Sequence, residues 1–340
     1  MEIRQIENIN EWEEFNKKQL HTLFVQSLSY GNFYGLLGES HYIFGIYNNN
    51  QLIGGALVLT THAKRGNFLY IPYGPILPEN NKKEALTLFT SFLKEFAQKD
   101  GDFSFIRVSP FLINNEENRF LFKSLGYVNA PMHVLAEHTW ILDLSLSEDE
   151  LLFNMNKNHR NLIRRCIREK VRVEKNTTAG YLDKFLEIYK DTANRHKFFK
   201  FSDEYVRGEF GEFAGKNEVL VWDAYLPDNS LDSSAVIMYY GSMAAYRHGA
   251  SKNLNKKLPT SYLLQWEAIL EAKNRGMKYY NFWGIAPENS PKHPFFGITH
   301  FKKGFGGYAL ELLHCQDIPL NNKYYLNWTI ESIRRIKRGF

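Results

Sequence analysis

The sequence predicts an α/β protein that contains two tandem copies of one structural unit. One order of elements, a hairpin followed by a strand, a helix and a strand, occurs in both halves of the chain. The second copy follows the first at a nearly constant offset of about 175 to 180 residues, which indicates a duplication. The length of 340 residues also exceeds the usual size of a single core. We therefore expect two domains, each with a mixed β-sheet flanked by helices.

The first unit begins with a hairpin over residues 42–60, where apolar and β-branched runs flank an Asn-rich turn. A strand that ends in "YIPYGP" follows. Residues 82–99 form the predicted helix, because apolar side chains recur there at three- and four-residue spacing: Leu86, Phe89, Phe92, Leu93 and Phe96. The strand "FSFIRVSP" closes the unit.

The second unit repeats these elements over residues 218–285. Its hairpin is "EVLVWDAYLPDNSLDSSAVIMYYG", and the next strand is "SMAAYRHGAS". The helix "LPTSYLLQWEAILEAKNRG" ends at Gly276, as expected of a glycine just past a helix. The strand "MKYYNFWGI" follows it.

This order suits an acyltransferase-type fold, in which the donor is held where two central strands splay apart. A member that binds coenzyme A would need an Arg/Gln-x-x-Gly-x-Gly/Ala turn before the central helix, whose backbone N–H groups surround the pyrophosphate. The two copies have "YGPILPENNKKEA" and "SKNLNKKLPTSY" there, and neither contains the turn. The sequence therefore weighs against acetyl-CoA as the donor, and no cofactor is expected.

The composition indicates a globular cytoplasmic protein. Hydrophobic residues make up 44% of the chain, and no apolar run approaches the roughly 20 residues that span a bilayer. The start of the chain does not resemble a signal peptide. Cys166 and Cys315 lie far apart and outside any metal-ligand spacing, so neither a disulfide framework nor a metal site is expected.

Positive charge is concentrated between the two units. Residues 157–172 contain seven Lys and Arg residues against one acid, Glu169. On a helix, one face would present Lys157, Arg160, Arg164 and Arg168, with Arg165 beside it. Leu162, Ile163, Cys166 and Ile167 would anchor the opposite face. A solvated surface helix normally mixes charges of both signs, so we favour the binding of a polyanion. The phosphates of a nucleic acid or of a nucleotide sugar would both suit it.

A second basic segment lies at the C-terminus. It sets Leu326, Ile330 and Ile333 against four basic residues, Arg334, Arg335, Lys337 and Arg338. Such a helix either rests on an anionic membrane surface or docks on its domain through the apolar residues. Docking on the domain is the favoured interpretation.

Residues 282–307, "FWGIAPENSPKHPFFGITHFKKGFGG", combine glycines, prolines and aromatic rings with two adjacent lysines. Glycines let a backbone turn sharply or approach a ligand closely. Two interpretations follow: a packed loop with solvated lysines, or a pocket that needs a fixed positive charge.

Several segments together resemble the Fem family of peptidoglycan-bridge peptidyltransferases (FemABX). They are "FVQSLSYGNFYGLLG", "YIPYGPIL", "HRNLIRRCIREKVRVE", "DTANRHKFF", "LPTSYLLQWEAILEAKNRGMKYYNFWGIAP" and "FKKGFGG", and they cover nearly the whole chain. The resemblance implies two tandem GNAT-like acyltransferase domains, residues 1–145 and 146–320, followed by a basic helix over 321–340. The helical-hairpin insertion of some members is absent, which indicates a compact subtype.

The resemblance also implies a function. Members transfer an amino acid from aminoacyl-tRNA to an amine of a cell-wall precursor, either UDP-MurNAc-peptide or its lipid-linked form. A cytoplasmic monomer, with possible peripheral contact at the inner face of the membrane, is expected. Two alternatives stay open: another acyl donor or amine acceptor, and a non-catalytic RNA-binding protein on the same scaffold.

By the same correspondence Lys302 lies near the aminoacyl ester with Phe301 beside it, as a fixed ammonium that stabilises the oxyanion. Arg195 would bind precursor phosphates, and Tyr246 and Arg247 would line the same cleft. The tRNA would be received by the basic helix, through Lys157, Arg160, Arg164, Arg165 and Arg168. Lys303 is the alternative cation, and His293 and His300 are alternative general bases.

The sequence departs from the family pattern in the first domain. Tyr34 stands where the family often has a lysine, Tyr73 where an arginine precedes Gly-Pro, and Ser109 where an acid precedes Pro110. Tyr34 is retained as a candidate substrate-binding residue. Since the first domain contributes to holding the precursor in the family, these changes affect the acceptor more than the reaction.

Overall fold

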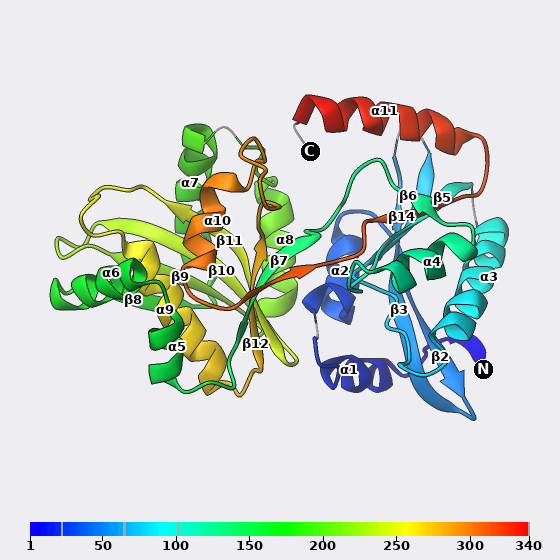
Figure 1. Ribbon diagram of the computed structural model, residues 1–340, viewed down its shortest axis with the longest axis horizontal. Coiled ribbons are helices and arrows are strands. Elements are labelled where there is room, and N and C mark those ends of the chain that lie inside the picture. The colour runs from blue at the N-terminus through cyan, green and yellow to red at the C-terminus, as the bar shows by residue number, and fades with distance from the viewer. Residues whose placement is uncertain (22, 64–65, 101, 197, 339–340) are drawn as a thin grey trace. The chain divides into compact units, whose positions relative to one another are not determined.

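The protein consists of two compact units in the computed structural model, which describes residues 1–338 except 22, 64, 65, 101 and 197 (Figure 1). The first unit contains Met1–Gln19, Val25–His138 and the chain from Leu310 onward. The second contains Leu20–Phe24 and Thr139–Ala309. Each unit is an α/β domain built on its own seven-stranded sheet, so the predicted fold class is confirmed.

The sheet of the first unit has the strand order β1-β2-β3-β4-β5-β14-β6. Its strands are β1 (Glu2–Gln5), β2 (His41–Asn48), β3 (Gln51–Thr61), β4 (Asn67–Pro72), β5 (Phe103–Ser109), β6 (Val128–Asn129) and β14 (Gln316–Pro319). The helices are α1 (Ile9–Lys17), α2 (Leu28–Leu36) after the 3₁₀ turn η1 (Phe24–Gln26), α3 (Lys82–Asp100), α4 (Glu116–Ser124) and α11 (Lys323–Arg338).

The sheet of the second unit has the order β13-β7-β12-β11-β10-β9-β8. Its strands are β7 (His138–Asp143), β8 (Arg172–Asn176), β9 (Val219–Tyr225), β10 (Leu231–Tyr240), β11 (Met243–Ser251), β12 (Tyr279–Gly284) and β13 (Tyr308–Glu311). The helices are α5 (Glu148–Asn154), α6 (Lys157–Arg168), α7 (Ala179–His196), α8 (Asp203–Ala214), α9 (Thr260–Asn274) and α10 (Phe296–Lys303).

The predicted repeat is present in both units. In the first, the antiparallel hairpin β2–β3 leads to β4, and α3 connects β4 to the parallel strand β5. In the second, β9–β10 leads to β11, and α9 connects β11 to the parallel strand β12. Both central helices bury an apolar face against their sheet, as shown by Leu86 and Phe89 of α3 and by Leu264 and Ile269 of α9. The hydrophobic spacing in the sequence predicted the buried face of α3 correctly.

The C-terminal part of the chain differs from the predicted boundaries of 1–145, 146–320 and 321–340. Strand β14 pairs with β5 on one side and with β6 on the other, so it completes the first sheet. Asp317 of β14 accepts two hydrogen bonds of 2.8 Å from Arg107 of β5. Residues from Leu310 to Leu320 therefore belong to the first unit, not to the second.

None of the helices in the described part of the chain is both long enough and apolar enough to cross a lipid bilayer.

Candidate functional site

The second unit contains an opening between its two central parallel strands. The ladder between β11 and β12 joins Met243–Ala245 to Tyr279–Asn281 and ends there, although β11 continues to Ser251 and β12 to Gly284. In the first unit, β4 pairs with β5 along its whole length, from Asn67 to Pro72. The splayed strands expected of a donor site therefore occur in the second sheet, and we call this region the wedge.

Lys302 of α10 reaches the wedge. Its Nζ atom donates a 2.6 Å hydrogen bond to the carbonyl oxygen of Gly284, the last residue of β12. The same atom lies 5.9 Å from the ring centroid of Tyr246, the first β11 residue beyond the ladder, and 5.9 Å from that of Phe295. Only 7% of the Lys302 residue is exposed. A long cationic side chain is thus held in a dry site beside the splayed strands.

Burial lowers the pKa of Lys302 to about 7. Desolvation is the cause, and among the described residues no carboxylate forms an ion pair with the Nζ atom. The ammonium expected from the sequence is therefore not fixed, because the group changes charge near neutral pH. A lysine with this pKa is a far better proton donor than an exposed lysine.

Phe301 belongs to an aromatic cluster that joins the lysine segment to α6. Its ring centroid lies 5.0 Å from that of Tyr262 and 5.3 Å from that of Phe305. The buried His159 of α6 donates from Nε2 to the carbonyl oxygen of Phe301 at 3.0 Å. Burial lowers the pKa of His159, which favours the neutral ring. The basic helix is therefore attached to the segment that carries Lys302.

Gly304 is required where His159 packs against this segment. A Cβ atom at position 304 would lie 2.0 Å from His159, whereas one at Gly297 of α10 would meet nothing within 4 Å. We expect Gly304→Ala to lower the free energy of unfolding by about 1–3 kcal/mol through overpacking. Gly297→Ala, the matched control, is expected to be neutral or to stabilise the helix by up to about 1 kcal/mol. Urea unfolding of both variants tests this, and equal effects would contradict it.

The five basic residues of α6 differ in how far their side chains are engaged by other groups of the protein. Arg160 donates to three carbonyl oxygens at the end of α5, at 2.5–3.0 Å, and so caps that helix. Arg165 donates to the Lys257 carbonyl oxygen, and Arg168 pairs with Glu169. Lys157 and Arg164 are exposed and have no ion pair among the described residues. These last two are the best placed for a polyanion.

The anchoring face of α6 differs in part from its prediction. Ile163 and Cys166 are buried, whereas 56% of Ile167 is exposed. His159 takes the anchoring position at the start of the helix, four and seven residues before them. The spacing of His159, Ile163 and Cys166 was a signal for this role that the sequence-based interpretation did not use.

Arg195 lies in the last turn of α7 and binds the end of β11 and the residue that follows it. Its guanidinium donates to the carbonyl oxygens of Ser251 and Lys252 at 2.5 and 3.0 Å. The residue remains exposed. Arg195 is therefore hydrogen-bonded to the backbone of its own unit, although its side chain remains accessible to solvent.

Arg247 forms a buried ion pair, which the sequence did not reveal. Its Nε and Nη2 atoms donate to Glu209 of α8 at 2.9–3.1 Å. Burial alone would raise the pKa of Glu209, but Arg247 and His248 lower it to about 2. Arg247 also lies over the ring of Trp283, 5.3 Å from its centroid. Its guanidinium holds α8 against the β11 side of the wedge, whereas Tyr246 contacts the lysine.

The alternative groups near Lys302 make other contacts. The Nζ atom of Lys303 lies 5.3 Å from the ring centroid of Trp140. His293 accepts a 3.1 Å hydrogen bond from the Phe295 backbone through Nδ1. His300 is exposed. Lys302, rather than Lys303, is the cation at Gly284.

The residues that depart from the family pattern lie in the first unit. Tyr34 of α2 packs against the rings of Tyr30 and Phe33. Tyr73 is buried and donates a 2.6 Å hydrogen bond to the Ala136 carbonyl oxygen. The hydroxyl of Ser109 is buried beside Cys315. The first unit therefore carries phenol and hydroxyl groups at these positions instead of charges.

The segment before α9 contains a buried carboxylate of this chain. Asp232 accepts a 2.7 Å hydrogen bond from the Leu254 backbone and a 2.6 Å hydrogen bond from the Thr260 hydroxyl at the start of α9. A carboxylate at this helix N-terminus is unfavourable for a bound pyrophosphate, because both groups are anions that seek the same donors. The geometry thus adds a second argument against coenzyme A.

Comparisons with known proteins agree with this architecture. A model of the FemAB family matches residues 8–232 and 227–331. The aminoacyltransferase FemA of Staphylococcus aureus (strain MW2) is 25% identical over 263 residues, which cover 75% of this chain and 52% of FemA. The chain thus spans about half the length of the curated relatives it matches.

Two solved structures share the fold. A crystal structure of FemX superposes with a TM-score of 0.87 at 19% identity, covering 97% of this chain and 100% of FemX. A tandem GNAT protein from the clavulanic acid biosynthesis pathway superposes with a TM-score of 0.59 at 11% identity, covering 94% of this chain and 98% of that protein. Two tandem GNAT-like domains therefore describe the architecture.

Proposed function

The chain belongs to the FemAB family, and we propose that it transfers an amino acid from aminoacyl-tRNA to an amine on the stem peptide of a peptidoglycan precursor. The relative FemA is named an aminoacyltransferase. The product would be an interpeptide bridge, made in the cytoplasm on UDP-MurNAc-peptide or on its lipid-linked form. The single observation that carries the proposal is the buried Lys302 at the wedge, where the donor is expected.

The reaction needs little covalent help from the protein. The precursor amine attacks the ester carbonyl carbon, a C–N bond forms, and the bond from that carbon to the ribose oxygen breaks. The amine loses a proton and the ribose oxygen gains one, so no oxidant, metal or nucleotide is consumed. An aminoacyl ester is already activated, and catalysis then rests on orientation and on stabilising the oxyanion.

In this proposal Lys302 acts in its ammonium form. Placed beside the ester, the ammonium would donate to the oxyanion of the tetrahedral intermediate, and its lowered pKa favours proton donation to the leaving ribose oxygen. Phe301 and Tyr262 would shield the ester from water. Tyr246 would bound the opposite side of the donor site. Arg195 and Tyr34 are proposed to contact the precursor, and Arg247 to keep α8 in place beside β11.

The tRNA is proposed to bind along α6, mainly through Lys157 and Arg164. We expect the double substitution Lys157→Gln with Arg164→Gln to weaken tRNA binding and to lower the slope of log K against log salt by about 0.7–0.9 per residue removed. Filter binding over a range of NaCl concentrations measures this slope. Lys83→Gln with Lys123→Gln removes equal charge from exposed positions of the first unit and should leave the slope unchanged.

A second candidate function keeps the donor and changes the acceptor. The observation that favours it is the replacement of charged groups by Tyr34, Tyr73 and Ser109 in the first unit. An acceptor other than a peptidoglycan precursor, such as an amine on a secondary metabolite or polysaccharide, would then be used.

Transfer of radiolabelled amino acids from a mixed aminoacyl-tRNA pool tests both candidates. UDP-MurNAc-pentapeptide and its lipid-linked form are offered as acceptors, with Lys302→Met in parallel. Label in either precursor that the substitution abolishes would identify the reaction and both substrates. Salt-sensitive tRNA binding without transfer to either precursor would reject this acceptor class and favour either another acceptor or a non-catalytic RNA-binding protein. Transfer that Lys302→Met leaves unchanged would reject the proposed role of Lys302.

A further inference from the structure

Helix α11 presents two different faces. One face is docked on the first unit through Tyr324, Asn327 and Glu331, which follow one another at three- and four-residue spacing. The sequence had suggested that Leu326, Ile330 and Ile333 would be the docking residues. That interpretation was wrong for Leu326 and Ile333, which are exposed, whereas Ile330 is partly buried. The fully buried positions of the helix are aromatic or polar instead.

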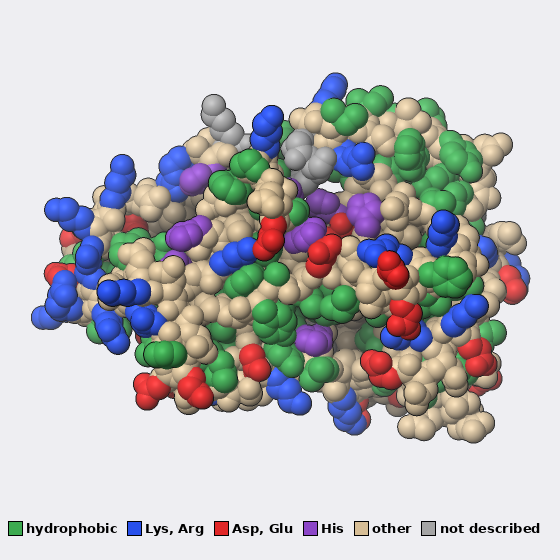
Figure 2. Space-filling model, viewed as in Figure 1, with side chains coloured by type: hydrophobic (Ala, Val, Ile, Leu, Met, Phe, Trp, Pro, Cys, Tyr) green, Lys and Arg blue, Asp and Glu red, His purple; other side chains and the backbone are tan. Residues whose placement is uncertain are grey.

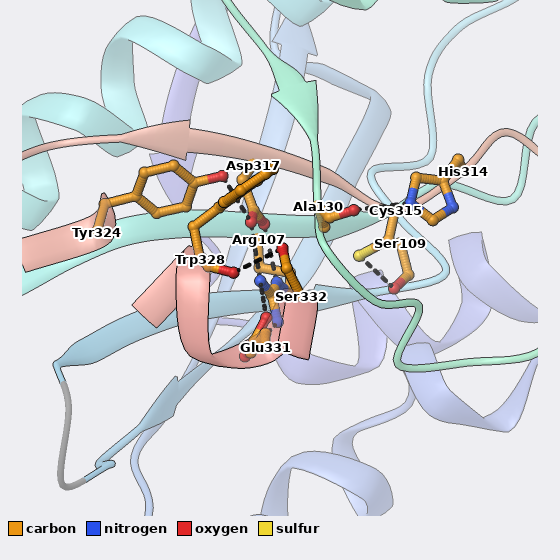
Figure 3. A network of polar contacts seen from close by, with 10 residues as sticks. All are labelled: Arg107, Ser109, Ala130, His314, Cys315, Asp317, Tyr324, Trp328, Glu331 and Ser332. Carbon is orange, nitrogen blue, oxygen red and sulfur yellow. Dashed lines mark hydrogen bonds and ion pairs between the residues drawn. The ribbon is translucent and has the colours of Figure 1, made fainter. Parts of the chain in front are cut away.

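The docking contacts are a buried polar network (Figure 3). Arg107 of β5 donates to Asp317 of β14 and to Glu331 of α11, with shortest distances of 2.8 Å to each carboxylate. The hydroxyl of Tyr324 donates to Asp317 at 3.2 Å. These contacts set the rotation of α11 about its own axis, and they direct the opposite face outward.

The outward face of α11 is apolar. Leu326 is 60% exposed, Ile333 is 50% exposed and Ile336 is 76% exposed, and Tyr325 and Trp328 flank them. Leu326 and Ile333 lie seven residues apart and Ile336 follows three residues later, so the three lie on one side of the helix. Figure 2 shows hydrophobic side chains gathered where α11 lies in Figure 1. A stripe of this kind is not explained by the core of the first unit.

The charges of α11 are arranged to suit an anionic partner. Glu331 is the one acid between Lys323 and Arg338, and Arg107 neutralises it on the docked face. Arg334 and Arg335 follow Glu331 by three and four residues, so they continue the docked side of the helix beyond its contacts, whereas Lys337 lies on the outer side. All three are exposed and form no ion pair among the described residues. The exposed charges at the C-terminal end of the helix are therefore all basic, and they accompany an apolar outer face.

We propose that the outer face of α11 docks the protein on an anionic phospholipid surface, with the helix lying parallel to the membrane plane. Apolar side chains would enter the acyl boundary, while arginine and lysine side chains would contact lipid phosphates. Tyr325 and Trp328 suit the interface, where aromatic rings with polar groups accumulate. The docking is independent of the proposed transfer reaction, since it uses neither Lys302 nor α6.

The test is co-sedimentation of the full chain with vesicles of pure phosphatidylcholine and with equimolar phosphatidylglycerol and phosphatidylcholine. We expect binding to the anionic vesicles, and binding that weakens at high salt. Replacing Arg334, Arg335 and Lys337 by glutamine should weaken binding on the order of 100-fold, at about fivefold per charge. Replacing Leu326, Ile333 and Ile336 by glutamine should weaken it by at least about 100-fold.

A matched control replaces three exposed apolar residues outside α11, Phe120, Phe153 and Leu254, by glutamine and should leave vesicle binding unchanged. Circular dichroism establishes that each variant is folded, and the charge variant tests the proposal even where the apolar variant does not fold. Absence of binding to anionic vesicles, or binding that survives both α11 variants, would overturn the proposal. A third result would also overturn the proposal: the wild type does not bind vesicles but forms a concentration-dependent dimer, and the apolar variant does not form this dimer. The outer face of α11 would then bind a second copy of the chain.

Discussion

Replacing Lys302 with methionine is expected to lower kcat/KM for aminoacyl transfer by about 10²–10³, the usual effect of removing one oxyanion donor. Methionine keeps the volume and the apolar stem of the side chain but removes the group that donates to Gly284 and, in the proposed reaction, to the ester oxygen. Affinity for tRNA should stay the same, since the basic residues of α6 are untouched. Single-turnover transfer and filter binding measure the two quantities separately.

The pH dependence of transfer gives this result a second, independent readout. Because burial lowers the pKa of Lys302 to about 7, the ammonium is lost as pH rises through neutrality. A reaction that needs the ammonium should show kcat/KM for the wild type falling above pH 7 relative to Lys302→Arg, because the ionisation of the acceptor amine affects both proteins equally. Lys302→Arg keeps its charge at every accessible pH, so any residual activity should lack this decline. If kcat/KM instead rises with pH near pH 7, and this rise is absent from the Lys302→Arg variant, the neutral amine of Lys302 would be the active form.

The same lysine should make stability depend on pH. Its pKa is lower in the folded protein than in the unfolded chain, so the unfolded chain binds the extra proton between about pH 7 and 10.5. The free energy of unfolding of the wild type, measured relative to Lys302→Met, should therefore rise with pH across this window. The loss of the Gly284 hydrogen bond adds a constant offset, which the slope is insensitive to.

Much of the fold could be predicted from the sequence, because the burial of one face of a helix or strand produces a periodic pattern of apolar residues within a short segment. The apolar spacing in α3 shows which side of the helix faces the sheet, and the turn residues mark the hairpins. Both copies of the unit were therefore predicted in the right order. No such local pattern in the sequence indicates the position of β14. Whether a four-residue strand joins the first sheet or the second depends on a partner more than two hundred residues away, Arg107, which the sequence does not pair with Asp317.

The candidate site could be predicted only where side-chain type alone limits the role. Aromatic rings and glycines drew attention to the two adjacent lysines, and the family resemblance singled out Lys302. Its acceptor is the backbone carbonyl of Gly284, which any residue would provide. Arginine identity did not separate a binding residue from a structural one: Arg160 caps α5 and Arg247 pairs with a buried glutamate. A lone Glu209 on an amphipathic helix gives no sign that it will be buried against that arginine.

Replacing Arg107 with methionine is expected to destabilise the first unit by about 3–5 kcal/mol, because it would leave Asp317 and Glu331 without their shared cation. Burial on its own would lower the pKa of Arg107, but the two carboxylates raise it well above its ordinary value, so the guanidinium stays charged in the folded protein. Urea unfolding followed by circular dichroism measures the loss. Arg119→Met, which removes an exposed arginine bonded to Asn114, is the matched control and should change the free energy of unfolding by less than about 0.5 kcal/mol.

The pH dependence of the Arg107→Met variant separates a lost ion pair from simple repacking. Burial already raises the pKa of Asp317 in the folded protein, and the bonds from Arg107 offset this rise only in part. Without the guanidinium the pKa rises further, so the folded variant binds the extra proton over a wider pH range. The stability deficit should therefore shrink as pH falls below about 5 and grow as pH rises toward neutrality. Adding Asp317→Leu to Arg107→Met removes the stranded carboxylate and should recover part of the lost stability at neutral pH. A deficit that is constant across pH, or that the second substitution deepens, would mean that β14 and α11 are held by packing and not by charge.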